Sequence, residues 1–119
     1  MTKTIELNFK DVTGNLPKEE ANSIYVLKRR DSICYIGKTT QSVEERMREH
    51  KESEDLSMRD GDKLFVATVD DSKSLEKVEG ILIYENKPEL NEKGKDCKPN
   101  YYDDYAIEVS DCDGLKGKK

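Results

Sequence analysis

The sequence predicts a small α+β fold, within the broad α/β class, whose elements follow the order ββαβα along the chain. Three observations predict this order: two short runs of β-branched and aromatic residues, a helix start signal after them, and then a third such run followed by a second amphipathic stretch. The chain has 119 residues, which suits a single domain because domains usually have about 100–200 residues.

The first two runs predict a β-hairpin. Residues 23–28 (SIYVLK) and 32–37 (SICYIG) are separated by the polar residues 29–31, a pattern typical of two strands and their turn. Because both faces of each run are apolar, we expect this pair in the middle of the sheet. Tyr25 and Tyr35 would share one face if the connecting loop has an odd number of residues, for example residues 29–31.

The next elements are a helix, a strand and a second helix. Ser42 opens the Ser-x-x-Glu pattern of a capping box, and helix formers then continue to about residue 53. Residues 63–69 (KLFVATV) predict a third strand. The second helix should begin after Asp71 and end before Pro88, since apolar residues recur at helical spacing between them.

Two extensions flank this central domain, which we expect at residues 23–91. Residues 1–22 carry scattered apolar positions and could form one short edge strand over residues 5–9. Residues 92–119 are rich in Lys, Asp and Gly. We expect one more strand near residues 105–109, followed by a frayed, disordered Gly-Lys tail.

The composition limits the class of protein. Hydrophobic residues make up 34% and charged residues 39%, so the core must be thin. No apolar run approaches the roughly 18–20 residues of a membrane span, and the N-terminus lacks the layout of a secretion signal. Cys34, Cys97 and Cys112 are too widely spaced for a zinc site or a disulfide framework. We therefore expect reduced thiols, a cytoplasmic location and no membrane partner.

The charge is unevenly distributed. A net charge of −5 argues against a nonspecific nucleic-acid binder, since such binding normally comes from clustered Lys and Arg. However, residues 17–51 carry eight basic and six acidic residues, whereas residues 52–113 carry eight basic and eighteen acidic residues. A polyanion would therefore meet the first half of the chain. The alternative is that both segments are ordinary solvated surface.

Three polar side chains occupy predicted apolar faces. Arg46 and His50 share a stripe with two apolar residues on the first helix, and Glu79 lies among apolar positions of the second. Each could be structural: Arg46 could rest its stem on the core, His50 could be a satisfied buried histidine, and Glu79 could pair with Arg46. With the two hairpin tyrosines and Lys38 they could instead form one site for phosphodiester chemistry with a metal ion.

These motifs resemble those of the GIY-YIG endonuclease family. The first is Ser23-Ile24-Tyr25, with Ser where the family usually has Gly, and the second is Tyr35-Ile36-Gly37. Arg46 and His50 follow on the first helix, then Glu79 on the second and Pro88-Glu89-Leu90-Asn91 after it. The resemblance spans about residues 23–91, more than half of the chain.

The resemblance implies a fold and an activity. The fold would be a small central three-stranded antiparallel sheet flanked by helices. The activity would be hydrolysis of DNA phosphodiester bonds with one divalent metal ion, Mg²⁺ or Mn²⁺. A chain this short resembles the stand-alone members of the family, and two subunits could pair to cut both strands.

The resemblance also implies residue roles. Glu79 would bind the metal ion, a hard cation that prefers oxygen ligands. Tyr25 would activate the attacking water, Tyr35 would help hold that water or the phosphate, and Arg46 would stabilise charge in the transition state. Two supporting residues, Lys38 and His50, would hydrogen-bond these groups, and Asn91 would help hold the site together. The DNA backbone would meet six basic residues: Lys28, Arg29, Arg30, Lys38, Arg48 and Lys51.

Two other classes of function remain open from the sequence. A nucleic-acid-binding or protein-interaction module could keep the same scaffold without cutting, which suits the acidic overall charge. Alternatively, Glu79 and Arg46 could form a buried ion pair in a structural interaction protein that needs no metal ion and binds no DNA.

Overall fold

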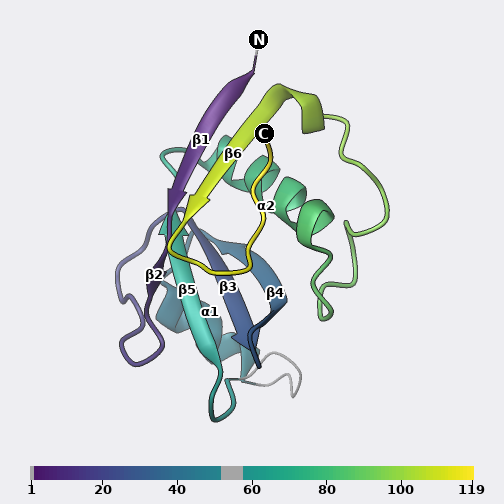
Figure 1. Ribbon diagram of the computed structural model, residues 1–119. Helices are drawn as coiled ribbons and strands as arrows, with labels where there is room; N and C mark the ends of the chain where they lie inside the picture. The colour runs from purple at the N-terminus through teal and green to yellow at the C-terminus, as the bar shows by residue number, and fades with distance from the viewer. Residues whose placement is uncertain (1, 52–57) are drawn as a thin grey trace.

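The computed structural model describes residues 2–51 and 58–119. The central sheet has the strand order β2-β5-β3-β4, and all of its pairs are antiparallel (Figure 1). A separate two-stranded parallel sheet contains β1 and β6. In chain order the elements are β1 (Lys3–Asn8), β2 (Lys10–Asp11), β3 (Ser23–Arg29), β4 (Ser32–Thr39), α1 (Val43–His50), β5 (Lys63–Thr68), α2 (Ser72–Asn86), the 3₁₀ helix η1 (Tyr102–Asp104) and β6 (Tyr105–Ser110).

The predicted order ββαβα is confirmed by β3, β4, α1, β5 and α2. The antiparallel sheet flanked by two helices is confirmed too, although it has four strands, because the two-residue strand β2 adds to the outer edge of β5. The expectation that both hairpin strands lie in the middle is wrong for β4, which forms an edge. Its apolar residues are buried there because the segment after α2 covers that edge: Leu90 N–H donates to the Cys34 carbonyl at 2.8 Å.

The hairpin turn is shorter than expected. Only Arg30 and Asp31 form it, and both have positive φ values, 51° and 65°, as a tight two-residue hairpin requires. The strand register shifts by one residue at a β-bulge between Leu27 and Lys28. This shift has the same effect on the facing of the side chains as the expected three-residue loop. Tyr25 and Tyr35 therefore still lie on the same face of the sheet.

The helix ends follow the predicted chemistry. The Ser42 side chain caps α1 by accepting from Glu45 N–H at 3.1 Å, while the predicted end near residue 53 lies outside the described residues. The Asp71 side chain caps α2 by accepting from Ser74 N–H at 2.7 Å. At the other end of α2, Lys87 adopts a left-handed conformation before Pro88, as is typical of a helix C-terminus.

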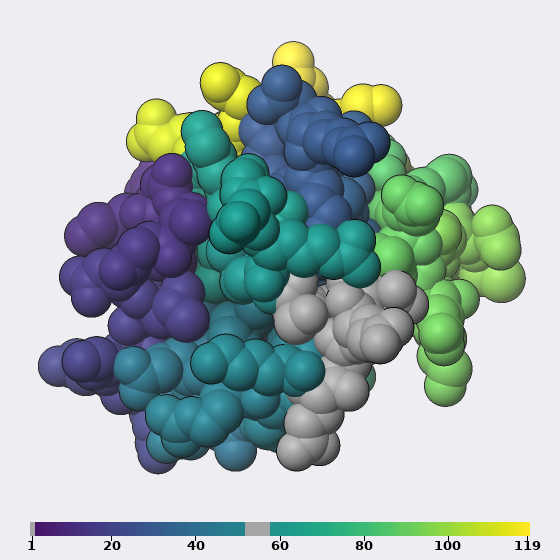
Figure 2. Space-filling model, turned by 90° about the horizontal axis from the view of Figure 1, so that it is seen from below, coloured from purple at the N-terminus to yellow at the C-terminus, as the bar shows by residue number. Residues whose placement is uncertain are grey.

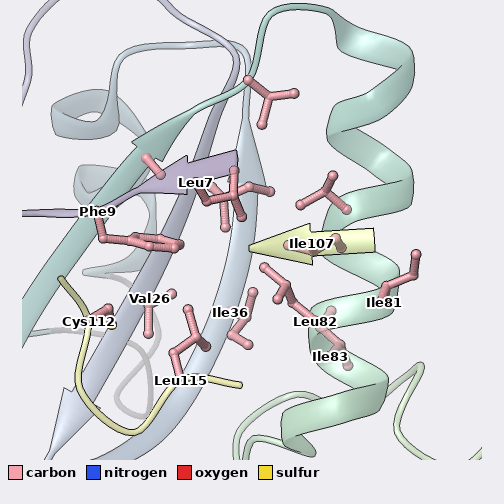
Figure 3. Packing of buried hydrophobic residues seen from close by; sticks show 14 of the residues in the cluster. Leu7, Phe9, Val26, Ile36, Ile81, Leu82, Ile83, Ile107, Cys112 and Leu115 are labelled. Carbon is pink, nitrogen blue, oxygen red and sulfur yellow. The ribbon is translucent and has the colours of Figure 1, made fainter. Parts of the chain in front are cut away.

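The two extensions pack together. The predicted N-terminal strand is present as β1 but pairs with the late strand β6, in parallel, rather than with the central sheet. The tail is not frayed: Lys118 N–H donates to the Ile107 carbonyl at 2.9 Å, and Cys112 and Leu115 are buried. Cys112 and Leu115 belong to the same apolar cluster as Phe9, Val26 of the central sheet and Leu82 of α2, and this burial holds the tail in place (Figure 3).

Apolar side chains cover both faces of the central sheet. On one face Val26 and Ile36 pack against Leu82 of α2 and against the extensions. On the other face Tyr25 and Leu27 pack with Val43 and Met47 of α1. Among the described residues no helix is long and apolar enough to cross a membrane.

Candidate active site

Tyr25 lies at the centre of the polar cluster on the α1 face of the sheet. Its side chain is only 1% exposed. Gly37 is its partner across the hairpin, and a Cβ atom at Gly37 would overlap the Tyr25 ring. The glycine of Tyr35-Ile36-Gly37 is therefore needed because the phenol of Tyr25 lies directly over that backbone.

Three rings meet around this point. The Tyr25 and Tyr35 ring centroids are 6.1 Å apart, which confirms that the tyrosines share a face. The His50 ring, carried by the last turn of α1, lies 5.9 Å from Tyr25 and 5.7 Å from Tyr35. His50 is buried, with 7% exposed. The helix thus brings the single imidazole of the chain against both phenols.

The Tyr25 hydroxyl has two polar partners on α1. Arg46 Nε donates to Tyr25 Oη at 3.3 Å, and Tyr25 Oη lies 2.8 Å from His50 Nε2. The guanidinium of Arg46 also reaches Glu49, at 3.5 Å. Because Arg46 can only donate, the phenol oxygen accepts from it and the phenol proton can point to His50.

The electrostatics fix the protonation states. Burial raises the pKa of Tyr25, with Tyr35 adding to the rise, while Arg46 opposes it. Burial also lowers the pKa of His50, and the Arg46 charge lowers it further. At neutral pH the pair is therefore a neutral phenol and a neutral imidazole, so the tautomer with its proton on Nδ1 can accept the Tyr25 proton at Nε2.

Glu79 is a half-buried carboxylate on α2. Burial raises the pKa of Glu79, whereas the charge and backbone N–H of Lys38 and the charge of Arg46 oppose the rise. The negative charge of Glu79 also raises the pKa of both Tyr25 and Tyr35. Glu79 is therefore close enough to both phenols to interact with them electrostatically. It forms no ion pair with Arg46 or with any other residue in the described ranges.

The donor set around Glu79 fits a lightly held hard cation. A desolvated carboxylate without a counter-ion gains from a nearby positive charge. Within residues 2–51 and 58–119, no group of three His, Cys, Asp or Glu side chains could hold a metal ion. One carboxylate with open positions suits Mg²⁺, which keeps several of its waters and also binds substrate phosphates.

A cleft adjoins these groups. It has a volume of about 390 Å³ and lies between the end of β4, α1 and the first turns of α2. Lys38, Arg46 and Glu76 are among the residues that line it. The cleft would let a phosphate approach both cations.

The edge of β4 is fixed by Asn91. Its side-chain amide accepts from Ile36 N–H at 3.0 Å and donates to the Ile36 carbonyl at 2.9 Å. Asn91 therefore pairs with Ile36 much as a neighbouring strand would. Its place is structural: it holds the strand that carries Tyr35 and Lys38.

The structure brings together Tyr25, Tyr35, Lys38, Arg46, His50 and Glu79, with Asn91 behind them. Sequence reasoning missed Glu76, whose place one turn before Glu79 is visible from helical spacing. It also missed Tyr101, whose hydroxyl lies against α2 at Gly80. No local pattern could have found Tyr101, because its contact joins distant parts of the chain.

Two of the six basic residues expected to meet DNA are engaged within the chain. Lys28 is buried, on the other face of the sheet from Tyr25, and donates to the Asp113 carbonyl at 2.8 Å. Arg29 pairs with buried Asp62 at 3.0 Å. Both side chains help to pack the turn end of the hairpin.

The other four are more accessible. Lys38 lines the cleft, while Arg48 and Lys51 are exposed on and just after α1. Arg30 is exposed at the hairpin turn, beside two cavities of about 630 Å³ each. Figure 2 shows this end of the molecule, where the turn lies beside the C-terminal segment.

The chain matches a known protein family. Residues 21–93 match the family model described as the GIY-YIG catalytic domain. No curated protein and no solved structure gives a significant match. The matched range is more than half of the chain, and it contains all seven of the residues expected to build the catalytic site.

Proposed function

Because the chain belongs to the GIY-YIG family, we propose that it is an endonuclease that hydrolyses DNA phosphodiester bonds with one bound Mg²⁺ or Mn²⁺ ion. The observation that carries this proposal is the convergence on the Tyr25 hydroxyl. Arg46 and His50 both hydrogen-bond it, and the carboxylate of Glu79, which forms no ion pair in the described ranges, interacts electrostatically with the same phenol.

Tyr25 would act as the base for the attacking water. A phenol with a raised pKa is almost never ionised at neutral pH, so a free phenolate is a poor candidate. The hydrogen bond to His50 avoids that difficulty. As Tyr25 Oη takes a proton from the water, its own proton would pass to His50 Nε2 and the water oxygen would form its bond to phosphorus. The bond from phosphorus to the leaving oxygen breaks, and that oxygen takes a proton from solvent.

Arg46 would stabilise this proton transfer and the reacting phosphate. Its Nε–H group remains on Tyr25 Oη and favours negative charge there, while the guanidinium also lines the cleft. Lys38 faces the same cleft and places a second positive charge near the phosphate. Tyr35 would help hold the water or a phosphate oxygen beside Tyr25.

Glu79 would hold the metal ion through its carboxylate. When bound, such an ion polarises a phosphoryl oxygen and stabilises the charge that develops on it. Glu79 suits this role because its burial is not offset by any ion pair in the described ranges. Glu76, one turn before Glu79 on α2, lines the cleft together with Lys38 and Arg46.

The direct test is cleavage of supercoiled plasmid by the purified protein with Mg²⁺, with Mn²⁺ and with EDTA. We expect cleavage only with metal, and loss of it in Glu79→Gln, which keeps the side-chain shape. Glu89→Gln is the matched control, because Glu89 is exposed outside the cluster and should be dispensable. Binding of the plasmid without metal-dependent cleavage would instead indicate a non-cleaving module on the same scaffold.

A further inference from the structure

Tyr101 brings the C-terminal extension to the metal-binding helix. It lies outside the matched residues 21–93, in the loop before η1. Its hydroxyl rests directly on α2, where a Cβ atom at Gly80 would overlap Tyr101 Oη. Gly80 follows Glu79 in α2, so the extension brings a hydroxyl to the turn of the helix that carries the residue that would hold the cation.

The glycine at this position needs an explanation. Gly80 lies in the interior of the 15-residue helix α2, where glycine costs about 1 kcal/mol relative to alanine. The close approach of Tyr101 accounts for it, since any side chain there would displace the hydroxyl. The helix therefore contains a residue of low helix propensity at the point where Tyr101 contacts it.

The Tyr101 hydroxyl is available as a donor. It makes no hydrogen bond within residues 2–51 and 58–119, and no buried side-chain oxygen there lacks a partner, so this oxygen is open to water. Burial raises the pKa of Tyr101, and the charges of Glu76 and Glu79 raise it further. The hydroxyl thus keeps its proton, and the negative charges of Glu76 and Glu79 both act on it.

We propose that Tyr101 is a positioning residue for Glu79. Its hydroxyl donates a hydrogen bond to one water, which in turn donates to the Glu79 carboxylate and holds that group in the orientation that binds the cation. The proposal rests on the proposed function, because it requires Glu79 as the metal ligand. Groups that orient a metal-binding side chain typically contribute about 10–100-fold to metal affinity.

Tyr102 provides a matched control. It is the next residue, and its hydroxyl donates to Glu85, a glutamate near the end of α2. Tyr101→Phe and Tyr102→Phe each remove one hydroxyl and leave the ring. Only the first should affect the site of Glu79.

The experiment measures the Kd for Mn²⁺ by electron paramagnetic resonance, and the melting temperature without metal, on the full chain. We expect Tyr101→Phe to raise the Kd about tenfold without lowering the melting temperature more than Tyr102→Phe does. Tyr102→Phe should keep the Kd within about twofold. An unchanged Kd in Tyr101→Phe would overturn the proposal.

Two further variants separate the possible failures. Gly80→Ala should raise the Kd like Tyr101→Phe, because the new methyl group displaces the hydroxyl, and it should add nothing in the Tyr101→Phe background. Glu79→Gln should abolish Mn²⁺ binding. If it does, and Tyr101→Phe binds normally, only the role of Tyr101 is wrong; if Glu79→Gln binds normally, the metal assignment itself fails.

Discussion

At the scale of single residues, the site depends on one oxygen atom with two neighbours of different kinds. Tyr25 Oη accepts from the permanently charged Arg46 and lies within hydrogen-bonding distance of a neutral His50. The first neighbour favours negative charge on the oxygen, and the second can receive its proton. A buried phenol can therefore act as a base without being ionised beforehand.

The neutrality of His50 predicts the pH dependence of cleavage. Burial and the Arg46 charge lower the pKa of His50 from its ordinary value of about 6.5. A protonated imidazole cannot accept the Tyr25 proton, so the rate should stay high as the pH falls to 6.5 and decline only below it. Single-turnover rates between about pH 5 and pH 8 measure this, with His50→Gln as the comparison. The same acid limb in His50→Gln would show that another group titrates.

At the scale of elements, the segment after α2 covers the edge strand β4, and the Asn91 side chain makes two of the hydrogen bonds. Asn91, with 7% exposed, satisfies both backbone groups of Ile36. An edge strand normally leaves such groups to water or to another chain. Because Tyr35, Gly37 and Lys38 lie on the same strand, the pairing also sets their positions in the site.

Asn91→Ala should therefore destabilise the protein. It leaves a backbone donor and acceptor of Ile36 without partners in a buried setting, at a cost of about 1–3 kcal/mol in the free energy of unfolding. Urea denaturation of Asn91→Ala measures this cost. Asn100→Ala, an exposed position in the C-terminal loop, is the matched control and should change little. Equal stability of the two variants would contradict the role of Asn91.

The local elements could be predicted from the sequence, and their pairing could not. Ser42 and Asp71 cap the two helices through local chemistry, so the sequence pattern alone predicts where both begin. The bulge between Leu27 and Lys28 cannot be predicted from the hairpin pattern. The same pattern of inward- and outward-facing residues fits a three-residue turn without a bulge equally well. The site residues were predictable because their motifs are local, whereas the contact between Tyr101 and Gly80 is not.

At the scale of the whole molecule, the ends of the chain and the charge distribution matter most. The parallel pairing of β1 with β6 joins opposite ends of the sequence, and no local pattern predicts such a contact. The net charge of −5 opposes the approach of DNA, so binding depends on where the basic side chains lie. With Lys28 and Arg29 engaged within the chain, the accessible cations near the site lie on and around α1.

This distribution predicts weak, salt-dependent binding of DNA. If about three or four phosphates are neutralised, log affinity against log salt concentration should have a slope near −3 to −4. Changing both Arg48 and Lys51 to Glu should weaken binding more than changing both Lys93 and Lys116, exposed residues on the extension, although both pairs alter the net charge equally. Titrations at several salt concentrations measure both effects. Equal losses would mean that overall charge governs binding.

The role of the Tyr25 hydroxyl is tested most directly by the single-turnover cleavage rate of Tyr25→Phe in Mg²⁺. This variant keeps the ring over Gly37 and removes only the oxygen shared by Arg46 and His50. We expect the rate to fall about 10²-fold or more, on the scale of general-base catalysis, while Tyr84→Phe, on α2, cuts normally. Cleavage by folded Tyr25→Phe at the wild-type rate would contradict the account.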